Sequence, residues 1–98
     1  MKLMVRFRGV PPTATMLDHV KEVLGGALVA LQATRASILL VAEGDLVECR
    51  VEVGLARGAV WVVRAASDDA LLAVEAAGDR LATRVPCLNE RAAPRHAA

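Results

Sequence analysis

Aromatic residues are scarce in this sequence, which contains one tryptophan, one phenylalanine and no tyrosine. Functions that need several exposed aromatic rings, such as stacking on unpaired bases, are therefore disfavoured. The interior must be built from aliphatic side chains, which are plentiful because hydrophobic residues make up 55% of the 98-residue chain. A chain of this length supports a single core, since two cores of about 50 residues each would both be marginal.

Cysteines and long apolar runs are also few. Cys49 and Cys87 are far apart and show no C-x-x-C spacing, which argues against a disulfide framework and against a zinc site. We expect Cys49 to be a small core residue. No stretch approaches the roughly 18 apolar residues of a membrane span, and Lys2 and Arg6 stand where a signal peptide would be apolar. These features predict a soluble cytoplasmic protein with no membrane partner.

Neither sign of charge predominates, because twelve Lys and Arg oppose eleven Asp and Glu and leave a formal net charge of +1. The chain as a whole is not the strongly basic protein expected of a general nucleic-acid binder. Any binding to nucleic acid must therefore come from a local patch. Arginine accounts for ten of the twelve basic residues, and its guanidinium suits bidentate contact with phosphate.

Four segments have the period-two alternation or the β-prone composition of strands: residues 3–8, 37–42, 47–55 and 60–66. A helix is predicted between the first two strands and another after the last. We therefore predict an α+β fold, a two-layer sandwich in β-α-β-β-β-α order, whose four-stranded sheet carries both helices on one face. The first strand is expected beside the second and parallel to it. The predicted domain spans 1–86, and 87–98 is expected to be a disordered tail.

The first predicted helix begins at a capping threonine, which is either Thr13 or Thr15. Gly25 and Gly26 interrupt its apolar spacing, and each costs about 1 kcal/mol relative to alanine inside a helix. The sequence therefore predicts either that the helix ends near Leu24 or that close packing against the sheet compensates.

The second predicted helix begins after a capping serine, Ser67, which places Asp68 and Asp69 in its first turn, near the positive end of the helix dipole. Apolar residues then recur at helical spacing. Pro86 is expected to end this helix.

No residue pattern typical of catalysis or of cofactor binding is present. His19 has no nucleophile at a recognisable motif spacing. Glu48 and Glu52 flank Arg50 on one strand, which is typical of a solvated sheet face rather than of an acid/base pair. The glycine pair lacks the Lys-Ser/Thr of a phosphate-binding loop. We predict no enzymatic activity, no cofactor and no metal.

Arginine placement is the remaining functional signal. Arg80 and Arg84 are four residues apart and therefore share one side of the second helix, with Arg91 just beyond. Cations there also complement the negative end of the helix dipole, so a purely structural role stays open. The polar faces of the strands form a second candidate patch, on which mixed charges typical of a solvated sheet are the favoured interpretation. Its basic residues are Lys2, Arg6, Arg8, Arg50 and Arg64.

Residues 67–85 fit the pattern D-x-Y-x-A-I-D-x-x-x-D-K-L-x-R-Q-L by residue type at Asp69, Ala73, Val74, Glu75, Asp79, Arg80, Leu81 and Val85. Residues 10–13, Val-Pro-Pro-Thr, look like the matching strand-to-helix turn. With the predicted element order and the length, these residues make the chain resemble the ribosome hibernation promoting factor and protein Y family, also called sigma-54 modulation proteins. The basic position between Arg80 and Arg84 is Thr83 here, and the aromatic position is Leu71.

The resemblance implies a fold similar to double-stranded RNA-binding domains. It also implies a stress-response role in which the protein binds the small ribosomal subunit and modulates translation. The residues implied to contact ribosomal RNA phosphates are Arg80, Arg84, Lys21 and Arg91. The alternative is a protein-interaction or dimerisation module of the same fold, forming a homo-oligomer through Met4, Val60 and Val62 on the outer sheet face.

Overall fold

The alternation seen in the sequence corresponds to four strands, which combine with two helices in the predicted β-α-β-β-β-α order. The computed structural model describes the backbone of residues 1–56 and 58–92 and the side chains of residues 1–56 and 58–84. The elements are β1 (Lys2–Arg8), α1 (Ala14–Ala30), β2 (Ala33–Glu43), β3 (Leu46–Leu55), β4 (Val60–Ser67) and α2 (Ala70–Ala92).

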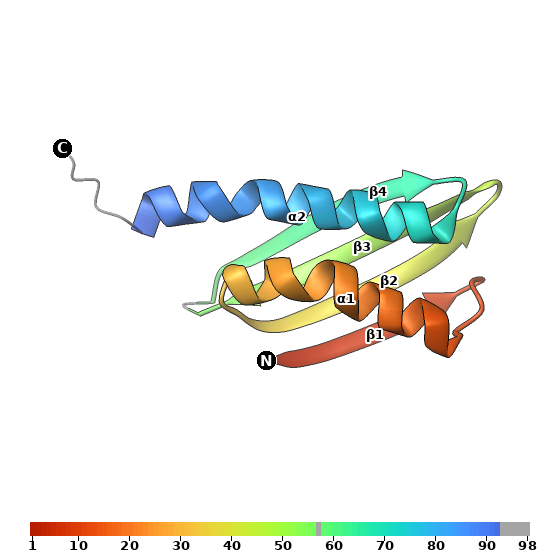
Figure 1. The fold of residues 1–98 in the computed structure, drawn as a ribbon, viewed down its shortest axis with the longest axis horizontal. Coiled ribbons are helices and arrows are strands. Elements are labelled where there is room, and N and C mark those ends of the chain that lie inside the picture. The colour runs from red at the N-terminus through yellow and green to blue at the C-terminus, as the bar shows by residue number, and fades with distance from the viewer. Residues whose placement is uncertain (57, 93–98) are drawn as a thin grey trace.

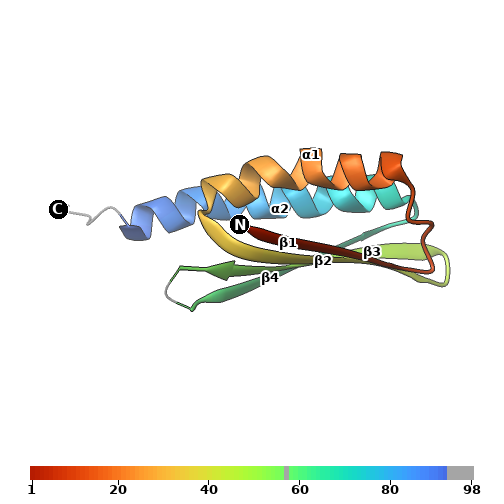
Figure 2. The same ribbon diagram turned by 90° about the horizontal axis from the view of Figure 1, so that it is seen from below.

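The strands form one sheet in the order β1-β2-β3-β4. β1 pairs with β2 in parallel, and the two remaining pairings are antiparallel. Both helices lie on the same face of this sheet (Figure 1), and the view from below shows its other face uncovered (Figure 2). The predicted two-layer α+β sandwich is confirmed.

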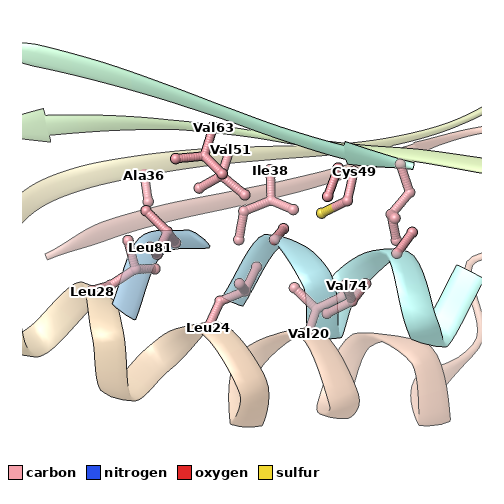
Figure 3. Close-up of a cluster of buried hydrophobic side chains, with 14 of the residues drawn as sticks. Val20, Leu24, Leu28, Ala36, Ile38, Cys49, Val51, Val63, Val74 and Leu81 are labelled. Atoms are coloured by element: carbon pink, nitrogen blue, oxygen red, sulfur yellow. The ribbon is translucent and has the colours of Figure 1, made fainter. Parts of the chain in front are cut away.

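The core lies between the sheet and the helices and consists of aliphatic side chains with one thiol, Cys49. Side chains from α1, such as Val20 and Leu24, meet Val74 of α2 and Ile38 and Val51 of the sheet (Figure 3). No polar or charged residue is buried among the described residues. Each fully buried aliphatic side chain of this size contributes about 1.5–3 kcal/mol to stability, so these contacts hold the two layers together.

Thr13 caps α1, which decides between the two predicted caps. The Met16 backbone N–H donates to Thr13 Oγ1 at 3.1 Å. Neither outcome predicted for the glycine pair is observed. The helix continues to Ala30, and a Cβ built on Gly25 or Gly26 would have no neighbouring heavy atom within 4 Å.

The helix continues past the glycine pair because Leu24 and Leu28, on either side of it, are both buried in the core. Tertiary packing therefore overrides the low helix propensity of the two glycines.

Asp69, rather than Ser67, caps α2. Its carboxylate accepts from the Leu71 backbone N–H at 2.8 Å, and the helix begins at Ala70. Ser67 is instead the last residue of β4, and its hydroxyl accepts from the Asp69 N–H at 3.4 Å. The two aspartates therefore precede the helix.

The predicted end of α2 at Pro86 is wrong, because the helix extends to Ala92. A proline removes one backbone N–H and disturbs one turn, which a long helix can continue beyond. The helix thus enters the segment predicted to be a tail. Residues 93–98 of that segment lie outside the described residues, and the division of the chain at residue 86 stays a prediction.

Alanine substitutions at the helical glycines are expected to have opposite effects on stability. At Gly25 and Gly26 the added methyl meets no atom, so each substitution should stabilise the protein by about 1 kcal/mol. At Gly78 a Cβ would lie 2.8 Å from Val23 Cγ1, and the stiff valine rotamer makes Gly78→Ala destabilising. Denaturant unfolding measures the stability of all three variants. Restored stability in Gly78→Ala/Val23→Ala is expected, and a stabilising Gly78→Ala would contradict this packing.

Cys49 is a buried core thiol, as predicted, and burial raises its pKa from 9.0 to about 12. The folded state therefore favours the neutral thiol. The resulting stability is fully present below pH 9.0 and declines as the pH rises towards about 12. Between about pH 8 and about pH 10, wild type should lose ~1.4 kcal/mol more unfolding free energy than Cys49→Ala. Denaturant titrations at both pH values test this, and equal losses would contradict it.

Candidate nucleic-acid interface

Arg80 on α2 contacts the exposed edge of the sheet. Its Nη1 donates a hydrogen bond to the backbone carbonyl of Arg64 on β4. β4 is the last strand of the sheet and has a neighbour on one side only, so alternate carbonyls along it lack a strand partner. Arg80 therefore satisfies one edge carbonyl and has further N–H groups for another acceptor, because a guanidinium carries five donors.

Arg84 lies one turn further along α2 and packs on an aromatic ring of β4. Its guanidinium carbon is 5.0 Å from the centroid of the Trp61 ring. This is cation–π geometry, which leaves the edge of the guanidinium available for hydrogen bonds. Arg84 remains exposed while Trp61 is half-buried against the core. The sheet edge thus holds Arg80 and Arg84 in defined positions.

These arginines line an open groove between α2 and β4, formed by Val62, Val63, Arg64, Arg80, Thr83 and Arg84. A second, smaller groove crosses the outer face of the sheet and includes Arg6, Leu39, Arg50 and Glu52. Val62 and Arg64 line both grooves. The two candidate arginine patches of the sequence therefore meet at Arg64, which makes one continuous basic surface around the edge of the sheet.

Lys21 does not join this surface. His19 of α1 faces α2, because its Nε2 lies 3.5 Å from Glu75 Oε2. Two residues along a helix turn the direction of the side chain by about 200°, so the exposed Lys21 points away from α2. Arg91 lies outside the residues whose side chains are described. Of the four residues implied to contact RNA, the structure thus brings together Arg80 and Arg84.

Among the residues considered for catalysis, Glu48 and His19 each lie next to a charged side chain. Arg50 Nε donates to Glu48 Oε1 on the outer sheet face, and this hydrogen bond raises the pKa of Arg50. Glu48 is therefore part of an ion pair on a solvated sheet face. His19 sits between the two helices, and within the described residues no group of His, Cys, Asp and Glu side chains is arranged to hold a metal ion.

Two contributors to the surface were missed by sequence reasoning. Trp61 lies on the side of β4 that faces the core, and its contact with Arg84 depends on the position of α2 along β4. Arg35 was placed before its strand, whereas β2 begins at Ala33. A Cβ on Gly54 would lie 2.5 Å from Arg35 Nε, so the arginine side chain lies directly over this glycine. Where a glycine on one strand is paired with an arginine on the neighbouring strand, the arginine side chain can lie over the glycine. This pairing is the signal that predicts such a contact.

The Arg84–Trp61 contact predicts a measurable coupling. A double-mutant cycle with Arg84→Ala and Trp61→Leu should give a coupling free energy of about 0.5–1 kcal/mol, the range of an exposed cation–π pair. Unfolding followed by far-ultraviolet circular dichroism measures it without the tryptophan signal. The matched cycle of Lys21→Ala with Trp61→Leu should give no coupling, and equal values in the two cycles would refute the contact.

Within the described residues, no helix has the length and apolar character needed to cross a membrane. No protein-family model matches the sequence, and no curated protein matches it with statistical significance.

Solved structures do match this chain. The Protein Y N-terminal domain of Thermus thermophilus superimposes with a TM-score of 0.75 at 24% identity, covering 87% of this chain and 96% of that one. A ribosomal subunit interface protein from Coxiella burnetii superimposes with a TM-score of 0.77 at 16% identity, covering 91% of this chain and 98% of that one. The fold expected from the sequence resemblance is thereby confirmed: the chain has the fold of these two proteins.

Proposed function

We propose that this protein associates with the ribosome by binding RNA of the small subunit and modulates translation as a stress or hibernation factor, with no catalytic step of its own. Two structures that share its fold bear the names Protein Y and ribosomal subunit interface protein. The observation that carries the proposal is the convergence of Arg80 and Arg84 with Arg64 on one open groove.

The geometry of the groove suits phosphate oxygens. Arg80 is held by the Arg64 carbonyl and Arg84 by the Trp61 ring, so both guanidinium groups are positioned before a ligand arrives. Such preorganisation reduces the side-chain entropy lost on binding. RNA duplexes are recognised through their backbone and shape more than through base edges. A chain with two aromatic residues and exposed arginines fits that mode of recognition.

Of the two remaining residues implied to contact RNA, Arg91 belongs to the proposed contacts and Lys21 does not. Lys21 lies on the side of α1 that points away from α2 and is therefore separate from the groove. Arg91 lies two turns beyond Arg84 along the same helix. Counterion-release binding weakens with each cation lost, and Thr83 stands between the two groove arginines. We therefore expect an association that is highly sensitive to salt.

A protein-interaction module is the second candidate, and exposed apolar residues favour it. Met4 is 47% exposed and Val62 is 47% exposed, on the outer face of the sheet. Val60 is exposed on the same face of β4. A homodimer through these residues would depend on apolar burial and would strengthen with added salt, whereas binding to RNA would weaken. The direction of the salt dependence separates the two functions.

Co-sedimentation with purified small ribosomal subunits tests the proposed function. Wild type should pellet with the subunits at about 50 mM salt and be largely released at about 200 mM salt. Arg80→Glu/Arg84→Glu should not pellet at either concentration. Arg80→Lys/Arg84→Lys keeps both charges and should retain partial binding, because lysine lacks the bidentate geometry.

Circular dichroism confirms in each variant that the fold is intact. Failure of wild type to pellet even at low salt would refute the proposed function. Unchanged pelleting of the glutamate variant would remove Arg80 and Arg84 from the interface.

A further inference from the structure

Charge is segregated between the two sides of this nearly neutral protein. Strand alternation and register place six cations on the outer face of the sheet: Lys2, Arg6, Arg8, Arg35, Arg50 and Arg64. The same face carries three carboxylates: Glu43, Glu48 and Glu52. Apart from Arg80 and Arg84, which line the groove with β4, the exposed surface of the helices is here called the helix face. In the part of the chain with described side chains it carries four acidic residues and one lysine: Asp18, Lys21, Glu22, Glu75 and Asp79. A polyanion is therefore attracted to the sheet and repelled by the helix face.

An arginine row crosses the sheet at one level. The register aligns Arg6 with Leu39, Leu39 with Arg50, and Arg50 with Arg64. Neighbouring strands lie about 4.8 Å apart, so the row extends for roughly 14 Å from β1 to β4. The three arginines line the smaller groove that crosses this face. Leu39 is half-buried between Arg6 and Arg50, as expected where arginine stems cover an apolar residue.

The carboxylates of this face reduce its charge unequally. Glu48 is paired with Arg50, its neighbour along β3. Glu52 is exposed and lines the groove itself. Glu43 is exposed at the end of β2. Arg6 and Arg64 are exposed at the two ends of the row, and Arg64 continues it to Arg80 and Arg84 at the sheet edge. Glu52 is thus the carboxylate that would most directly oppose an anion in the groove.

We infer that the outer face of the sheet, and not the helix face, is the surface that docks on RNA, and that it binds the phosphodiester backbone of structured RNA. This inference rests on the proposed function. Backbone contact follows because no aromatic ring lies on that face in the described part of the chain: Phe7 and Trp61 both pack against the core. Arginines at fixed register positions suit phosphates, whose recognition requires charge and hydrogen-bond donors rather than stacking.

A matched pair of charge-neutralising variants tests the choice of face. Glu52→Gln removes a negative charge from the sheet groove, and Glu22→Gln removes one from the exposed side of α1. Affinity for purified small ribosomal subunits is measured at about 50 mM salt, where a single charge still acts over a Debye length. Glu52→Gln should tighten binding by up to about fivefold, the Coulomb effect of one nearby charge in water. Glu22→Gln should change affinity by less than about twofold, because it lies on the opposite layer.

A second pair tests the same assignment by loss of a cation. Arg6→Gln removes the end of the arginine row that is most distant from Arg80 and Arg84, whereas Lys21→Gln removes the lysine of the helix face. Arg6→Gln should weaken binding and reduce the slope of log affinity against log salt by about one unit. Lys21→Gln should leave the slope unchanged.

The possible results separate this inference from the proposed function. If wild type binds and the helix-face variants move the affinity while the sheet variants do not, the inference is overturned and the ribosomal function stands. Equal effects of both pairs would also overturn it, since they would show general electrostatic attraction without a docking face. A concentration-dependent dimer that dissociates in Val62→Asp would assign the sheet to a second copy of the chain. No binding by wild type at low salt would overturn both.

Discussion

The strands direct the side chains of the core cluster to one side of the sheet, and α1 and α2 together bury that side. The close contact of Gly78 with Val23 allows the helices to lie next to each other over four strands. Because the core is formed entirely on one side, every alternate strand residue is directed to the open face. The positions of the basic side chains on that face are therefore a consequence of how the core is packed.

This constraint explains why the fold was accessible from the sequence. Leu3, Val5 and Phe7 alternate with Met4, Arg6 and Arg8. Residues 47–53 repeat the period of two, so periodicity alone predicts these strands and their buried side. The errors occur at helix ends and glycines. Asp69 caps α2 in place of Ser67 because Ser67 is the last residue of β4. The helix α1 continues through Gly25 and Gly26 because Leu24 and Leu28 are buried in the core. Both depend on tertiary packing that local propensity does not encode.

The candidate site was predictable only in part. The four-residue spacing of Arg80 and Arg84 predicts that they share one side of α2, which the structure confirms. Their partners, the Arg64 carbonyl and the Trp61 ring, depend on how α2 is placed against β4, and a sequence period cannot supply that placement. Strand register likewise aligns Arg6, Arg50 and Arg64, which are widely separated along the chain. A net charge of +1 thus conceals a basic sheet face and an acidic helix face.

The proposed docking of the sheet face on RNA follows from this segregation of charge. Backbone and arginine side-chain resonances of this 10.3 kDa chain can be followed by nuclear magnetic resonance during titration with a structured fragment of small-subunit ribosomal RNA. If the sheet face docks on the RNA, the largest shift changes should occur at Arg6, Leu39 and Arg64 and extend to Arg80. The shift changes of Lys21 and Glu22 should stay small. Shift changes concentrated on α1, with the sheet resonances unmoved, would contradict this docking.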